Sequence, residues 1–202
     1  MREQVLVVGI GNELLGDEGL GVHVARSLLE RPELPDCGLE VLEAGTSLLD
    51  ALPEMARYQR VILVDAVVAG GEPGTIYRTR SVAPLLAAEM PPREISLHQW
   101  NLIEVFRVAR TLNLTPAAVE LIGAEPAQMG PGLELSPTLA RSAARIVELL
   151  IAEHGGQTAP RAGSAGGADS TPSRPRRPGG GEDSQRVSVS ITTPPAMRAA
   201  KL

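Results

Sequence analysis

The sequence predicts one α/β domain, a three-layer sandwich with about five mostly parallel strands in a twisted sheet and helices on both faces. Short aliphatic runs alternate with segments in which apolar residues recur every three or four positions, from residue 4 to residue 154. One run, Val61-Ile62-Leu63-Val64, is aliphatic at every position, which is typical of a central strand covered on both faces. These two observations place one α/β domain at residues 1–156.

The expected elements follow the chain in a regular order. Strands are expected over residues 4–9, 39–42, 60–67, 75–78 (half-exposed, because its residues alternate) and 118–123. Helices are expected from about Glu18 to before Pro32, from Ser47 through Met55, over 82–90, over 100–112, and from Ser136-Pro137 through Ile151. Ser47 and Asp50 have the spacing of a capping box, and Ser136 and Pro137 fit the N-cap and first turn of the last helix.

The composition changes abruptly after the last helix. Residues 157–202 are rich in Gly, Ser, Pro, Thr and Arg, and predict a disordered tail that cannot build a packed core. The tail holds 7 Lys and Arg against 3 acidic residues, whereas residues 1–156 hold 12 Arg against 21 acidic residues. An acidic body argues against nucleic acid as a partner.

The remaining composition bounds the protein's environment. The single cysteine, Cys37, excludes an internal disulfide, is expected to be an ordinary loop thiol, and fits a reducing cytoplasm. No apolar run reaches 18 residues, and the N-terminus leads directly into a strand without room for a signal peptide. We therefore expect a cytoplasmic protein that does not insert into a membrane, and we expect it to be a monomer.

The segment GIGNELLGDEGLGVHV, residues 9–24, joins the first strand to the first helix. It begins like a dinucleotide fingerprint, but Leu14 stands where the third glycine is needed, so the close approach of helix and strand should be missing. Three acidic residues would also repel a phosphate. A dinucleotide-binding oxidoreductase is thus disfavoured, and a cation suits the turn better. Asp17 is well placed to cap the helix, and Glu18 is either a second dipole-compensating acid or a ligand.

Two further polar residues occupy costly places. Asp65 ends the most apolar strand, where a carboxylate normally needs a partner or a metal, and His98 lies in a loop between two expected helices. Asp65 could instead cap a neighbouring turn, and His98 could be an ordinary surface residue. If the first and third strands are neighbours, Glu18 and Asp65 meet at one edge, which His98 could reach. Two carboxylates and an imidazole suit nickel or zinc with open positions.

Several segments resemble the hydrogenase maturation endopeptidases. They are GIGNELLGDEG, VILVDAV ending near Asp65, SLHQ around His98, LIGAEP and GLELSP, and they span essentially residues 4–152. The resemblance implies an aspartic-type peptidase that cuts a C-terminal extension from the large-subunit precursor of a nickel–iron hydrogenase after nickel insertion. It implies that Glu18, Asp65 and His98 bind the metal, which is the substrate's own nickel and which other divalent ions can replace. The departures, Trp100-Asn101 and the tail, bear on which hydrogenase is served.

The implied chemistry assigns catalysis to Glu18 and Asp65, beside the bound metal. A carboxylate or a metal-activated water would attack the scissile bond, and the metal or the N–H groups of the turn would stabilise the oxyanion. No G-x-S-x-G elbow is present, which argues against a serine hydrolase. The alternative that the sequence leaves open is a nickel-binding maturation chaperone on the same fold that does not cut.

Overall fold

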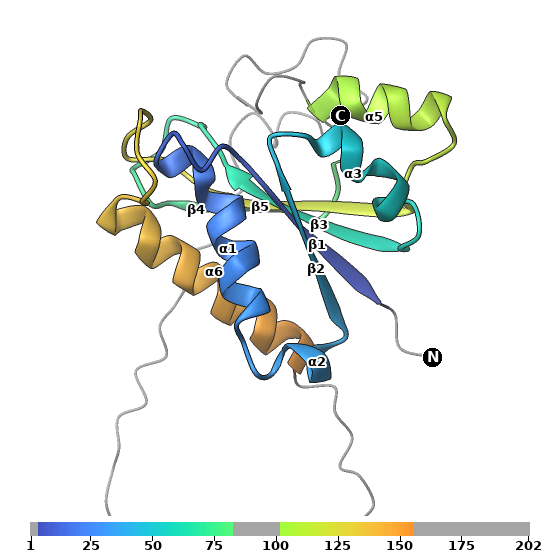
Figure 1. The fold of residues 1–202 in the computed structure, drawn as a ribbon, viewed down its shortest axis with the longest axis horizontal. Coiled ribbons are helices and arrows are strands. Elements are labelled where there is room, and N and C mark those ends of the chain that lie inside the picture. Colours follow the sequence, from blue (N-terminus) through green and yellow to red (C-terminus); the bar gives the residue numbers. More distant parts are fainter. Residues whose placement is uncertain (1–3, 83–101, 156–202) are drawn as a thin grey trace, which may run out of the picture.

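The computed structural model describes residues 4–82 and 102–155 (Figure 1). The five strands are β1 (Val5–Ile10), β2 (Leu39–Gly45), β3 (Arg60–Ala66), β4 (Ile76–Thr79) and β5 (Ala118–Ala124). The helical elements are η1 (Asp17–Gly19), α1 (Leu20–Leu29), α2 (Leu34–Cys37), α3 (Leu48–Met55), α5 (Leu102–Thr111) and α6 (Pro137–Gly155). No helix in these two stretches is long and apolar enough to span a bilayer.

The strands form one sheet in the order β2-β1-β3-β5-β4. Every pairing is parallel except that of β4 with β5, which is antiparallel at the sheet's edge. The predicted five-stranded, mostly parallel sheet is confirmed. Because β1 and β3 are direct neighbours, the loops that follow them emerge side by side at the carboxyl edge of the sheet.

Helices cover both faces of the sheet, with α1 and α6 on one face and α3 and α5 on the other (Figure 1). Alternation along β1 explains the two layers of core. Val5 and Val7 pack with α1 and α6, whereas Leu6 and Val8 pack with α3 and α5. A central parallel strand that feeds both cores must be apolar throughout, and all six residues of β1 are buried.

Two glycines bring α1 against the sheet. A Cβ atom at Gly21 would collide with the carbonyl oxygens of Val64 and Ile10, and one at Gly9 would collide with the carbonyl of Gly21. The expectation that the chain lacks a close helix–strand approach is therefore wrong. The approach is present, but Gly9 and Gly21 provide it in place of a glycine at position 14.

The edge strand β4 is more buried than its alternating sequence predicts. Arg78, in the strand that was expected to be half-exposed, is buried, and its guanidinium donates to Glu120 of β5 at 3.0 Å and to Glu153 of α6 at 2.7 Å. Glu120 also accepts from Arg60 of β3 at 2.7 Å. This buried chain of ion pairs joins three strands and the last helix.

Three local expectations need correction or fall outside the described residues. Ser47 is the N-cap residue of α3, but its side chain makes no capping hydrogen bond, so the expected capping box is absent. Cys37 is buried in α2, where its thiol contacts the carbonyl of Glu33, and is not an exposed loop thiol. The helix expected over 82–90, apart from Val82, and the tail expected at 157–202 lie outside the described residues.

Candidate functional site

The candidate site lies at the carboxyl edge of the sheet, where β1 and β3 end beside η1. Gly11 starts the turn after β1 with φ +137°, and a Cβ there would collide with the carbonyl of Glu18. The glycine therefore lets the chain fold back, so that η1 lies directly over the end of β1. This brings Glu18 to the edge of the sheet next to β3.

Asp65 is the next-to-last residue of β3, and its side chain is completely buried. Its Oδ1 accepts a hydrogen bond from the N–H of Ala66 at 2.8 Å. Its Oδ2 is buried and has no hydrogen-bond partner among the described residues. Burial raises the pKa of the Asp65 carboxyl well above its usual value, the Ala66 N–H opposes this in part, and the negative charge of Glu18 raises the pKa further.

The elements that carry these two predicted residues contact each other, since η1, with Glu18, packs against β3, with Asp65. Glu18 itself is partly buried, as the second residue of η1. His98 lies outside the described residues, so its position relative to the two carboxylates stays a prediction. Within the described residues, no group of three or more His, Cys, Asp and Glu side chains is arranged to hold a metal ion.

Asp17 has a role that the sequence analysis missed. It is fully buried and makes no capping hydrogen bond to η1 or α1, so the predicted helix cap is wrong. Its Oδ2 accepts from the N–H groups of Ala127 and Gln128 at 2.8 and 3.0 Å and from the Ser136 hydroxyl at 2.9 Å, and its Oδ1 accepts from the Ser136 N–H at 2.7 Å. Asp17 therefore anchors the loop between β5 and α6 to the turn that carries Glu18.

Ser136 has both of the roles that its position allows. As predicted, it caps α6, because its hydroxyl oxygen accepts a hydrogen bond from the Leu139 N–H at 3.2 Å. The same hydroxyl donates to Asp17. The sequence signal of a capping serine was visible, but its partner 119 residues away had no local signal.

Glu125, in the GAEP segment, is a second buried acid that the sequence analysis did not single out. Its carboxylate accepts from the N–H groups of Ala69 at 2.9 Å and Gly71 at 3.2 Å and from the Tyr77 hydroxyl at 2.8 Å. Burial, followed by the contact with Glu125, raises the pKa of Tyr77 to about 12. Glu125 thereby fixes the loop that leaves β3 just after Asp65.

Six N–H groups of the turn already donate hydrogen bonds within the protein. They belong to Gly11, Leu14, Leu15, Gly16, Glu18 and Gly19. Gly16, for example, donates to the carbonyl of Gly132 at 2.8 Å. These hydrogen bonds stabilise the turn, and an oxyanion role for its amides stays a prediction.

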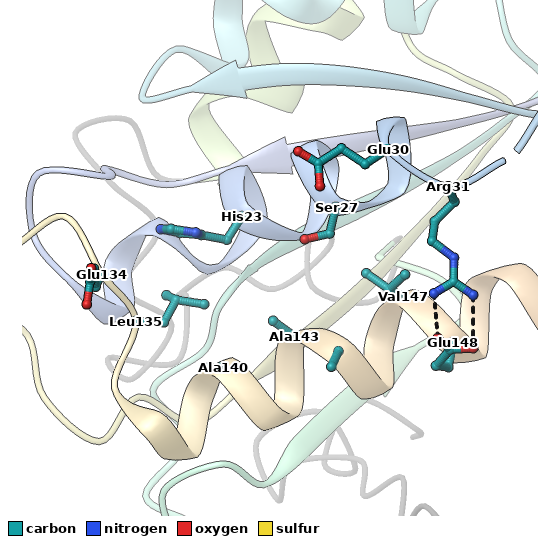
Figure 2. Close-up of a pocket in the computed structure, with 11 residues that line it drawn as sticks. His23, Ser27, Glu30, Arg31, Glu134, Leu135, Ala140, Ala143, Val147 and Glu148 are labelled. Carbon is teal, nitrogen blue, oxygen red and sulfur yellow. Dashed lines mark hydrogen bonds and ion pairs between the residues drawn. The ribbon is translucent and has the colours of Figure 1, made fainter.

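A pocket of about 650 Å³ lies away from these carboxylates, between α1 and α6 (Figure 2). His23 and Glu134 lie toward one end of it, and the ion pair of Arg31 with Glu148 lies at the other. Neither Glu18 nor Asp65 lines it. The catalytic residues predicted from the sequence therefore belong to the sheet edge and not to this pocket.

Sequence comparisons relate the chain to known proteins. Residues 22–153 match the family model HycI, hydrogenase maturation protease. The chain is 33% identical over 164 residues to the hydrogenase 2 maturation protease of Escherichia coli (strain K12). The alignment covers 78% of this chain and 96% of that protein. It is 32% identical over 172 residues to the hydrogenase expression/formation protein HupM of Azotobacter chroococcum mcd 1, covering 80% and 78%.

Solved structures give the same result. The hydrogenase maturating endopeptidase HybD from E. coli superposes with a TM-score of 0.59 at 30% identity, over 74% of this chain and 91% of that one. The [NiFe] hydrogenase maturation protease HycI from Thermococcus kodakarensis KOD1 gives a TM-score of 0.59 at 28% identity, over 77% and 94%. The fold and the sequence matches agree, and the chain belongs to the hydrogenase maturation protease family.

Proposed function

We propose that this protein is the endopeptidase that removes the C-terminal extension of a nickel–iron hydrogenase large-subunit precursor after nickel insertion. We further propose that Glu18, Asp65 and His98 bind the nickel of that precursor. Family membership supports the endopeptidase activity, because relatives are named hydrogenase maturation proteases. The observation that carries the nickel proposal is Asp65, a fully buried carboxylate with an oxygen that no described residue satisfies.

A buried carboxyl of this kind is costly unless a cation compensates it. In the free protein, the raised pKa favours the protonated form of Asp65. A cation that reaches Oδ2 displaces that proton and removes the repulsion from Glu18. The pair is thus suited to a divalent ion that arrives with a substrate, and nickel loading of the precursor becomes a condition for binding.

The two carboxylates differ in how deeply they are buried, and we use this difference to assign their roles in the reaction. Asp65 is completely buried and meets only a ligand that enters the edge of the sheet. Glu18 is only partly buried as a residue, although its Oε2 is enclosed. Both carboxylates bind the cation, and we assign to Glu18 the additional role of proton transfer from the attacking water to the leaving amide nitrogen.

The test is cleavage of a nickel-loaded precursor, followed by the loss of the extension's mass in mass spectrometry. Glu18→Gln, Asp65→Asn and His98→Ala should each lower the cleavage rate by about 100-fold or more, because each removes a proton-transfer group or a nickel ligand. Glu13→Gln is the matched control. Glu13 lies in the same turn, but it forms an ion pair with Arg26 at the protein surface, so its carboxylate should be dispensable for cleavage.

Two outcomes would contradict the proposal. Full-rate cleavage by all three variants would remove the assigned roles of these residues. A wild-type protein that binds the nickel-loaded precursor and leaves its mass unchanged would instead be a maturation chaperone.

A further inference from the structure

Exposed apolar side chains gather beside the candidate site. In the two described stretches, the large hydrophobic residues that are exposed are Leu14, Leu29, Leu112, Met129 and Leu133. Leu29 and Leu112 lie on or just after separate helices, and single exposed leucines are ordinary. Leu14 (62% exposed), Met129 (43%) and Leu133 (64%) instead lie on two loops that contact each other. We call these three residues the apolar rim.

Backbone hydrogen bonds hold the two loops of the rim together. Leu15 and Gly132 form a parallel bridge, and Gly16 and Met129 form an antiparallel bridge. The N–H of Gly132 donates to the carbonyl of Leu14 at 3.0 Å. The loops are thus linked as in a short sheet, which places the three apolar side chains on neighbouring backbone.

The buried carboxylate of Asp17 holds the same two loops together through side-chain hydrogen bonds. It lies one residue after Gly16 and receives hydrogen bonds from Ala127, Gln128 and Ser136 on either side of Met129 and Leu133. An apolar surface on backbone that is already ordered loses little conformational entropy when a partner binds. Clustered exposed apolar residues of this kind mark interaction sites.

The rim also adjoins the catalytic edge. The carbonyl of Leu15 accepts a hydrogen bond from the Glu18 N–H at 3.4 Å, so the rim and Glu18 belong to one continuous turn. Leu14 lies four residues before Glu18 in this turn, a separation that an extended substrate peptide of about four residues can span. The occupant that this position favours is the protein substrate itself.

We propose that the apolar rim binds an apolar segment of the precursor next to the scissile bond and so contributes substrate affinity. This inference rests on the proposed function, because it names a docking surface for the same substrate. A second copy of this chain is the competing occupant, and the experiment distinguishes the two.

The test compares Leu14→Ser/Leu133→Ser with Leu29→Ser/Leu112→Ser in full-length protein. The four leucines are between 54% and 64% exposed, so both double variants should unfold at the wild-type temperature. The rim variant should raise KM for the nickel-loaded precursor, and its Kd in calorimetry, by about tenfold or more, because interface anchors carry such effects. Its kcat should stay within about twofold of wild type, because binding that is equal in ground and transition states affects KM alone.

Three results would overturn the inference. One is a rim variant with wild-type KM and Kd. Another is an equal rise in the control variant, which would show a general effect of surface apolarity. The third is a wild-type dimer in size-exclusion chromatography that the rim variant converts to monomer. If the wild type binds the precursor but does not cut it, the proposed function fails, while the Kd comparison still tests the rim.

Discussion

At the scale of single residues, the candidate site is a balance between stability and function. Asp65 is buried with one oxygen unsatisfied and with the charge of Glu18 nearby. Such an arrangement destabilises the folded protein and favours a ligand that relieves it. A neutral side chain of the same shape should therefore stabilise the protein while it abolishes activity.

We predict that Asp65→Asn raises the free energy of unfolding at neutral pH by about 1 kcal/mol or more, because a neutral amide avoids the cost of ionising a buried carboxyl, about 1.4 kcal/mol for each unit by which its pKa is raised. The amide oxygen can keep the hydrogen bond from Ala66. Chemical denaturation measures the gain, and Asp50→Asn, at an exposed aspartate on α3, is the control. A variant less stable than wild type would contradict the prediction.

The same substitution has a predicted pH dependence with a definite sign. The folded-state pKa of Asp65 is raised, so the unfolded chain loses this proton at lower pH than the folded protein does. The cost to folding is therefore absent below the ordinary aspartate value of 3.8 and grows as pH rises toward the folded-state pKa. The gain in free energy of unfolding from Asp65→Asn should shrink as the solution is acidified toward pH 3.8. A gain that does not change with pH would contradict the raised pKa of Asp65 as its cause.

Sequence could predict Asp65 and Glu18, but not Asp17 or Glu125. Asp65 is conspicuous because it ends an aliphatic run, and Glu18 because it opens a helix after a glycine-rich turn. The hydrogen-bond partners of Asp17 are 110 to 119 residues away, and those of Glu125 are 48 to 56 residues away. Periodicity reports only on near neighbours, so these buried anchors give no local signal.

At the scale of elements, the loop from β5 to α6 depends on one carboxylate. The loop is rich in glycine and proline and largely exposed, and Asp17 accepts hydrogen bonds from both of its ends. Expectations from sequence were sound for elements with strong periodicity, such as β1, β3 and α6. They were less accurate for β4, where the ion pairs of Arg78 outweigh its alternating pattern.

We predict that Asp17→Ala destabilises the protein by about 2–4 kcal/mol, because it leaves buried donors without a charged acceptor. Amide hydrogen exchange at Ala127, Gln128 and Ser136 should accelerate, because the donors of these bonds lose their partner. Ser136→Ala is a graded control that removes one of the four hydrogen bonds and the helix cap, and it should cost about 1 kcal/mol. Unchanged exchange at all three amides in Asp17→Ala would exclude this anchoring role.

At the scale of the whole molecule, α6 closes the core. Its apolar stripe from Leu139 to Ile151 packs with α1 and the sheet, and the family match ends at residue 153. We predict that a chain ending at Gly155 unfolds within about 2 °C of the full-length protein, since the family match ends at residue 153 and the composition of residues 157–202 is not expected to build a packed core. Differential scanning calorimetry measures this, and a midpoint lower by more than about 5 °C would show that the tail contributes to the fold.

The bond between Asp17 and Ser136 has a consequence for biosynthesis. It joins positions 119 residues apart, so the loop beside the catalytic edge can be ordered only after nearly all of the domain has left the ribosome. Contacts so distant along the chain also form slowly, because a long loop must close before they contribute. A nascent chain in which Ser136 has not yet emerged therefore cannot order this loop, and the candidate site stays incomplete until nearly all of the domain is made.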